Sequence, residues 1–134
     1  MKRILVALMI MALAFRLAAQ TKGIDTNYTT RISSVKWMPD GKAILLGIVK
    51  HHKTDHQAPF FSKVFLYNIQ TAGLTFLFND GGNLTTSPDG KTIAFLKRSE
   101  KIRSTVYFYH MDSKRETTLT TDTLGKYGLD WSPD

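Results

Sequence analysis

One four-residue turn recurs along this chain. It stands at Pro39-Asp40-Gly41-Lys42 and at Pro88-Asp89-Gly90-Lys91, and its first two residues stand again at Pro133-Asp134. Proline presets φ for the first corner of such a turn, aspartate bonds back to nearby backbone amides, and glycine takes the left-handed conformation that follows. The copies are roughly 45 to 50 residues apart, a period typical of folds in which each repeat is one four-stranded sheet. The chain is therefore expected to contain a series of such sheets.

The sequence after each turn repeats as well. Lys42-Ala43-Ile44-Leu45-Leu46 aligns with Lys91-Thr92-Ile93-Ala94-Phe95, and Val64 to Asn68 aligns with Val106 to His110. The first copy is the longer one, and its extra residues fall around 51–61. Apolar and β-branched runs bounded by polar turns predict four short strands in each copy, at 31–37, 43–49, 63–69 and 74–78 and then at 83–86, 92–97, 105–110 and 116–120.

The predicted strands carry apolar residues on both faces. Ile93 and Phe95 alternate with Ala94 and Leu96. A sheet of this kind needs a neighbour on each side, and radially stacked blades supply one. We therefore expect an all-β fold made of β-propeller blades of four antiparallel strands, and an incomplete set of them. The expected set is about two blades plus the start of a third, with boundaries near 31–82, 83–126 and 127–134.

These repeats resemble a known family. Trp131-Ser132-Pro133-Asp134 and the run 87–95 are similar to the repeat of TolB-type, WD-like β-propellers, which reads as tryptophan, Ser-Pro-Asp-Gly-Lys and an apolar strand ending in phenylalanine. The first unit departs from this pattern, with Met38 in place of the serine and Leu45-Leu46 in place of the small-aromatic pair. The resemblance implies a propeller of roughly six to eight blades. It also implies an exported protein that often binds other proteins and sometimes carries further domains.

The N-terminal segment is expected to direct export. Two basic residues precede an apolar run at 4–15, and Ala18-Ala19 supplies small residues at the expected cleavage point, so residues 1–19 read as a secretory signal peptide. An uncleaved signal anchor is the rival interpretation, although the run is short for a membrane span. Residues 20–30 are mostly polar and predict an extended lead-in. The expected location is the periplasm or the cell exterior.

Composition limits the partners and the chemistry. The formal net charge is +7 at pH 7, but Lys2, Arg3 and Arg16 belong to the export segment and the other basic residues are spread along the chain. A nucleic-acid partner is therefore not expected. The chain contains no cysteine, which excludes disulfides and thiolate metal or redox sites in this stretch.

Few residues suggest a reactive site. His51, His52 and His56, with Asp55, form a local cluster of candidate metal ligands, but their polar, proline-bounded surroundings favour a solvated loop, and no metal is assigned. His110 aligns with a strand asparagine and is expected to be an edge polar residue. No nucleophile elbow, phosphate-binding loop or zinc-protease motif occurs, so no catalytic or cofactor-binding residue is assigned. The turn residues are expected to be structural: Pro39, Asp40, Gly41, Pro88, Asp89, Gly90, Pro133 and Asp134.

The aromatic residues of the repeats allow two interpretations. They could form a stacking platform for sugars or single strands. Their spacing along the predicted strands favours packing between blades instead. The residues concerned are Tyr67, Phe95, Tyr107, Phe108 and Tyr109, together with Trp37 and Trp131.

The leading hypothesis is an exported, non-enzymatic β-propeller scaffold that binds a protein or peptide. The alternative is the N-terminal propeller of an exported prolyl-oligopeptidase-type serine peptidase whose catalytic domain lies outside this chain, and a carbohydrate-binding propeller is a third possibility. Two blades alone should be unstable, aggregating or oligomeric. If about four large side chains lacked cover, at roughly 1.5 to 3 kcal/mol each, the loss of about 6 to 12 kcal/mol would rival the net stability of a domain.

Overall fold

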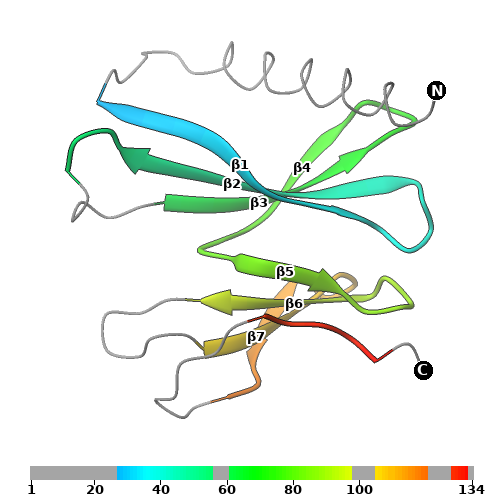
Figure 1. Cartoon of the computed structure of the whole chain (residues 1–134). Coiled ribbons are helices and arrows are strands. Elements are labelled where there is room, and N and C mark those ends of the chain that lie inside the picture. Colours follow the sequence, from blue (N-terminus) through cyan, green and yellow to red (C-terminus); the bar gives the residue numbers. More distant parts are fainter. Residues whose placement is uncertain (1–26, 56–60, 98–104, 121–127, 133–134) are drawn as a thin grey trace.

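The computed structural model describes residues 27–55, 61–97, 105–120 and 128–132 (Figure 1). The expected signal peptide (1–19), most of the expected lead-in, His56 and Pro133-Asp134 lie outside these ranges. All regular elements within them are β-strands. Across the same ranges, no apolar helix of membrane-spanning length occurs.

The strands form two separate four-stranded antiparallel sheets, with strand orders β1-β2-β3-β4 and β5-β6-β7-β8. The prediction of an all-β fold with four antiparallel strands per repeat is therefore confirmed. We call them sheet 1 and sheet 2; Figure 1 shows them one above the other. The strands are β1 Tyr28–Trp37, β2 Ala43–His52, β3 Phe61–Asn68, β4 Leu74–Asn79, β5 Gly82–Thr86, β6 Thr92–Lys97, β7 Thr105–His110 and β8 Arg115–Thr118.

Strand bounds differ from the sequence expectation mainly in the first hairpin. β6 and β7 have the predicted bounds, whereas β1 begins at Tyr28, within the expected lead-in, and β2 continues to His52. The two strands stay in register to that point, where Tyr28 lies opposite His52. Extra residues of the first repeat therefore lengthen a hairpin, because backbone pairing continues beyond the length of the second repeat's strands.

The sheets pack face to face, and we call the sides that meet their inner faces. Alternation along the strands places Ile93, Phe95 and Tyr109 on the inner face of sheet 2, since Ile93 pairs with Tyr109. Phe78 of sheet 1 stacks on Phe95 with ring centroids 4.3 Å apart and lies 4.8 Å from the ring of Tyr109. One buried cluster thus joins both sheets, with the members Met38, Ala43, Leu45, Val64, Phe78, Leu84, Ile93, Phe95 and Tyr109.

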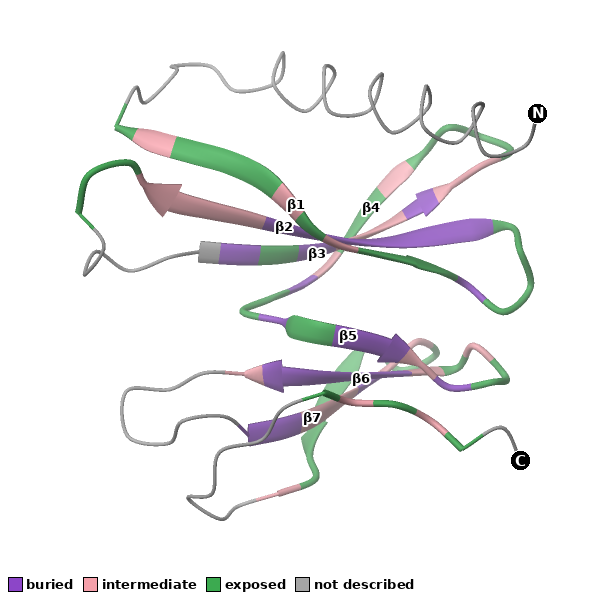
Figure 2. Cartoon of the chain, viewed as in Figure 1, coloured by how far each residue is buried: buried purple, intermediate pink, exposed green. Residues whose placement is uncertain are grey.

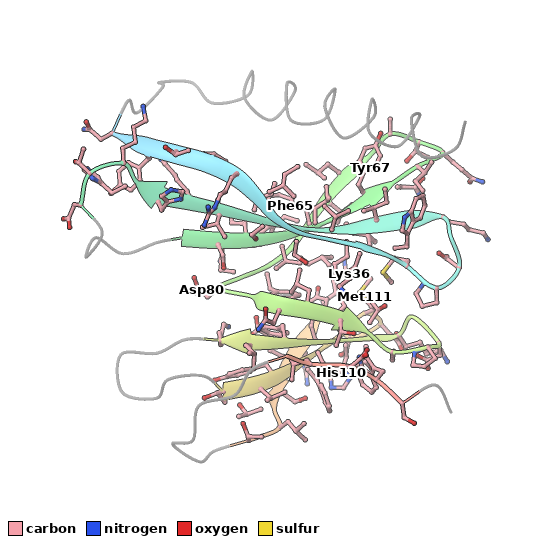
Figure 3. All side chains as sticks on the ribbon, viewed as in Figure 1. Lys36, Phe65, Tyr67, Asp80, His110 and Met111 are labelled. Atoms are coloured by element: carbon pink, nitrogen blue, oxygen red, sulfur yellow. The ribbon has the colours of Figure 1, made fainter. Side chains whose placement is uncertain are left out.

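The outer face of sheet 1 is the side turned away from sheet 2. Ile44, Leu46 and Tyr67 form a second buried cluster there, with Phe65 packed against it. Figure 3 shows Phe65 and Tyr67 on this side of the sheet. Figure 2 shows that burial is concentrated in strands such as β2 and β6, whereas β1 is largely exposed.

The expectation that both tryptophans pack between blades is wrong for Trp37. Its side chain is 49% exposed, on the outer face of sheet 1 opposite Ile44. The physical reason is that the described part of the chain places no second sheet over this face. Trp131 does pack: its ring stacks on that of Phe108, on the outer face of sheet 2, at 5.5 Å.

The connection between β4 and β5 sets one sheet against the other. Asp80 takes φ +62° there, and its backbone N–H donates to the carbonyl of Ser62 at 2.9 Å. The buried Ser62 hydroxyl donates to the Gly81 carbonyl at 3.2 Å. A Cβ at Gly81 would lie 2.7 Å from Phe78 Cε2 and 2.9 Å from Val64 Cγ2, so the close approach requires glycine.

Candidate functional site

The two complete Pro-Asp-Gly turns lie at the same end of the sheets (Figure 1). Gly41 and Gly90 take φ +68° and +72°, the left-handed region that the turn chemistry requires. A Cβ built on Gly90 would lie 3.5 Å from Pro39 Cδ, so the turns are in contact with each other. At this end of the sheets, which we call the turn end, the turn of one repeat packs against the turn of the next.

Side chains hold the second turn more firmly than the first. Asp89 Oδ1 accepts hydrogen bonds from the Ser87 hydroxyl at 2.6 Å and from the Lys91 backbone N–H at 3.0 Å. The Ser87 bond, followed by the Lys91 bond, lowers the pKa of Asp89 below 3.8, because both bonds favour the carboxylate. In the first turn, where Met38 replaces the serine, the bond described for Asp40 is the equivalent backbone one, from the Lys42 N–H at 2.9 Å. The described bonds of both aspartates thus support their own turns.

The opposite end of the sheets carries a different chemistry. Tyr28 begins β1, and Lys50 and His52 lie near the end of β2; we call these three residues the hairpin end. Lys50 Nζ stands 4.7 Å from the centroid of the Tyr28 ring, and His52 meets the same ring edge-on at 5.0 Å. Backbone pairing continues past the strands, since the N–H of Lys53 donates to the carbonyl of Asn27 at 2.8 Å. The extension thus presents an aromatic ring flanked by basic side chains.

The predicted histidine cluster is only partly described. His52 Nδ1 accepts the backbone N–H of Asp55 at 2.9 Å, so its lone pair is occupied. His51 and His52 are neighbours on one strand and therefore point to opposite faces of the sheet. Within the described ranges, no group of three or more His, Cys, Asp or Glu side chains could hold a metal ion. Among the described residues, none forms a hydrogen bond with the buried Nδ1 of His51.

The other polar candidates are engaged in sheet 2. His110 Nε2 lies 3.0 Å from the Thr117 hydroxyl on the neighbouring strand (Figure 3). Lys97 forms an ion pair with Glu116 at 2.6 Å. Burial, followed by the charge of Glu116, raises the pKa of Tyr109, which keeps the phenol protonated. None of these contacts forms a nucleophile activated by an adjacent base.

Apart from Trp37, the aromatic residues singled out in the sequence are packed against other side chains. Tyr67, Phe95 and Tyr109 are buried. Tyr107 stacks on Phe95 at 5.7 Å, and Phe108 lies against Trp131. A flat stacking platform needs exposed rings, so these residues do not form one.

Sequence reasoning missed the hairpin end. The sequence feature that could have indicated it is the extra length of the first repeat around residues 51–61, together with Lys50 and Lys53; this segment is typical of a solvated loop when only its composition is considered. Tyr28 gave no signal because it was assigned to the lead-in. The distance in sequence between Tyr28 and Lys50 hides their contact until the strand register is known.

Two solved structures have a similar fold. One is TolB from Acinetobacter baumannii, with 21% sequence identity and a TM-score of 0.53 over 75% of this chain and 23% of that chain. The other is the β-propeller domain of the Trilobed protease from Pyrococcus furiosus, which has an open velcro topology, with 18% identity and a TM-score of 0.54 over 68% of this chain and 27% of that one. No protein-family model and no curated protein matches the chain. The chain thus has the fold of β-propeller blades, as its repeats predicted, and spans about a quarter of the structures it matches.

Proposed function

We propose that this chain forms blades of an exported, non-enzymatic propeller scaffold, and that the hairpin end binds an acidic peptide segment of a partner protein. The observation that carries the proposal is the departure of the first repeat from the second. β1 and β2 extend beyond the paired length of β5 and β6, and the extension presents Tyr28, Lys50 and His52. Loops and extensions on a rigid scaffold are the usual place for binding residues.

Charge at this end favours carboxylates. Lys50 lies close to the ring of Tyr28, and the exposed Lys53 bonds to the backbone next to it. Asp55 is the acidic residue described at this end of the hairpin, whereas Asp40 lies in the turn at the other end. A carboxylate could pair with the ammonium group of Lys50, while an apolar part of the peptide covers the ring of Tyr28. The export signal predicted at residues 1–19 would place this surface outside the cytoplasm.

A phage-displayed library of random peptides, selected on the immobilised full chain, tests the proposal. We expect enrichment of peptides rich in Asp and Glu, with affinities that fall as salt rises. Lys50→Glu should lower the affinity of the selected peptides at least about tenfold, or ~1.4 kcal/mol. Tyr28→Ala should weaken the same peptides, because it removes the ring that orders Lys50.

Lys42→Glu is the control, since it makes the same charge reversal in the turn at the other end of the sheets, at an exposed lysine, whereas Lys50 is half-buried. It should leave peptide affinity nearly unchanged. Equal losses for Lys42→Glu and Lys50→Glu would mean that peptides respond to net charge alone. Selected peptides without acidic residues would contradict the proposed chemistry.

A second candidate function rests on the similarity to a protease's propeller domain. In that case the blades would control access to a catalytic domain, as in peptidases of the prolyl-oligopeptidase type. Reading the coding region beyond Asp134 distinguishes the two. A Gly-x-Ser-x-Gly segment after further repeats would favour the peptidase, and further repeats followed by a stop would favour the scaffold.

A further inference from the structure

Aspartate followed by glycine is the dipeptide most prone to rearrange its own backbone, because glycine has no Cβ to shield its nitrogen. The sequence contains three such pairs, Asp40-Gly41, Asp80-Gly81 and Asp89-Gly90, and the structure describes all of them. In each pair the glycine nitrogen can attack the side-chain carboxyl carbon of the aspartate. The surroundings of the three pairs differ, and this difference decides which of them reacts.

The rearrangement passes through a succinimide ring. The glycine nitrogen forms a bond to Cγ of the aspartate, and its proton leaves with the side-chain hydroxyl as water, so the carboxyl group must be protonated to react. Water then attacks the backbone carbonyl carbon of the aspartate and breaks the original bond from that carbon to nitrogen. The product, isoaspartate, carries the former carbonyl as a carboxylate, and its main chain runs through the side chain. The overall composition is unchanged, and water is the only other reactant.

The carboxylate of Asp89 is held in place. The Ser87 hydroxyl and the Lys91 backbone N–H both donate to its Oδ1, at 2.6 Å and 3.0 Å. Ser87 is buried, and its oxygen accepts the backbone N–H of Thr92 at 3.0 Å, which fixes the position of the hydroxyl group. The Ser87 bond, followed by the Lys91 bond, lowers the pKa of Asp89 and so leaves less of the protonated acid that reacts. Asp89-Gly90 should therefore rearrange slowly.

The second pair, Asp80-Gly81, is held through its backbone. The Asp80 N–H donates to the Ser62 carbonyl at 2.9 Å, and the Ser62 hydroxyl donates to the Gly81 carbonyl at 3.2 Å. Gly81 is also tightly enclosed, since a Cβ there would lie only 2.7 Å from Phe78 Cε2. Ring closure must rotate the peptide group between Asp80 and Gly81, and both the bonds and the packing oppose this rotation. This pair should also rearrange slowly.

The first pair, Asp40-Gly41, has neither restraint. Met38 stands where the second turn has its serine, and the bond described for the Asp40 carboxylate is that from the Lys42 N–H at 2.9 Å. Both residues of the pair are exposed, and a Cβ built on Gly41 would meet no atom within 4 Å. The glycine N–H donates to the carbonyl three residues before it at 2.9 Å in both turns, so the attacking nitrogen is bonded alike in each.

We propose that Asp40 is a site of isoaspartate formation, and that the turn serine, present as Ser87 and replaced by Met38 in the first repeat, protects the equivalent Asp89. Both aspartates stand in the same Pro-Asp-Gly-Lys sequence. The difference between them therefore comes from the fold and from the residue before the proline.

Isoaspartate at position 40 should alter the turn end. The rearrangement adds one methylene group to the main chain of the first turn. The Ile69 N–H donates to the Lys42 carbonyl at 3.0 Å just beyond this turn, and Pro39 packs against Gly90 of the second turn. A longer main chain would shift both contacts. Amide exchange of Ile69 should therefore be faster in the rearranged chain.

Incubation of the native full chain at mildly acidic pH tests the proposal, because more of each carboxyl group is then protonated. Samples taken over time are digested with trypsin, and isoaspartate is located by electron-transfer fragmentation. Trypsin separates Asp40 in the peptide 37–42 from the other two pairs in the peptide 64–91. Isoaspartate should accumulate at position 40 about three- to tenfold faster than at position 89, a factor that corresponds to the net contribution of one hydrogen bond.

Two exchanges of one side chain are the matched variants. Met38→Ser should slow the reaction at position 40, and Ser87→Ala should speed it at position 89, each toward the rate of the other turn. The native chain in urea is the reference for the unfolded state. There the identical local sequences should react at equal rates.

Three results would overturn the proposal. Equal rates at positions 40 and 89 in the native chain without urea would show that Ser87 gives no protection, as would an unchanged rate at position 89 in Ser87→Ala. Faster accumulation at position 80 than at position 40 would mean that the wrong pair was assigned. Isoaspartate that forms at position 40 in urea but never in the native chain would show that the folded turn prevents the reaction without a serine.

Discussion

Phe78 joins the two sheets, and its removal should loosen both. The side chain is 4% exposed and contacts two rings of the other sheet, Phe95 at 4.3 Å and Tyr109 at 4.8 Å. Truncating a buried phenylalanine to alanine costs about 3 to 5 kcal/mol through lost burial and the cavity left behind. Since part of that contact lies across the interface, we expect Phe78→Ala to destabilise sheet 2, to which it does not belong.

Amide hydrogen exchange measures this effect strand by strand, without requiring a cooperative melt. At about 1.4 kcal/mol for each factor of ten, the protection of the β6 and β7 amides should fall about a hundredfold or more, down to the unprotected rate if protection in the native chain is smaller. The change in β3 should be comparable, because Val64 packs in the same cluster.

Phe76→Ala is the matched control on the same strand. Phe76 points to the outer face, is 48% exposed and contacts one ring, that of Phe65 at 5.7 Å. Full burial of such a side chain is worth about 1.5 to 3 kcal/mol, and Phe76 is about half buried, so Phe76→Ala should lower the free energy of unfolding by roughly 0.8 to 1.5 kcal/mol. This effect should be confined to sheet 1. Unchanged protection of β6 and β7 in Phe78→Ala, or an equal loss in Phe76→Ala, would refute the coupling of the sheets through this ring.

Three smaller changes probe the turns and the link. Ser87→Ala should raise the pKa of Asp89 back toward 3.8 in a carboxyl NMR titration, and an unchanged titration would exclude the hydroxyl as the cause of the lowered pKa. Because the pKa of Asp89 is lower in the folded chain than in the unfolded chain, the stability that this carboxylate contributes is present above the unfolded pKa and is lost as pH falls through the folded pKa. Gly81→Ala should cost about 1 to 3 kcal/mol by overpacking, seen as faster exchange in β5, whereas Gly82→Ala, whose Cβ would meet nothing closer than 3.7 Å, should show no such crowding. Gly90→Ala should cost about 1 to 2 kcal/mol at φ +72°, and a stability equal to that of the native chain would argue against the observed turn.

Much of the fold could be predicted from the sequence because the same pattern of turn and strands occurs in both repeats. The alternation of Ile93 and Phe95 with Ala94 and Leu96 required two buried faces, and β6 has the bounds that this pattern indicated. The alignment of Val64 to Asn68 with Val106 to His110 predicted equivalent strands, and these segments lie in β3 and β7, each paired with the strand before it.

What could not be predicted depends on contacts that a local pattern does not contain. Trp37 has the sequence context of Trp131, yet one ring is exposed and the other is stacked, because packing of equivalent residues depends on which neighbour is present. The contact of Lys50 with Tyr28 needed the length of the first hairpin. The Ser87 bond to Asp89 depends on the orientation of a hydroxyl group, whereas the backbone bond from Lys91 follows from the turn chemistry.

The anchoring of the β4–β5 connection also bears on how such repeats can be recombined. Ser62 holds both Asp80 and Gly81, so the angle at which the next sheet leaves is fixed by residues of the preceding one. A chimera that takes one repeat from another protein should therefore keep 61–82 together as a cassette. A junction placed between Ser62 and Gly81 would separate the β4–β5 connection from the serine that fixes its direction.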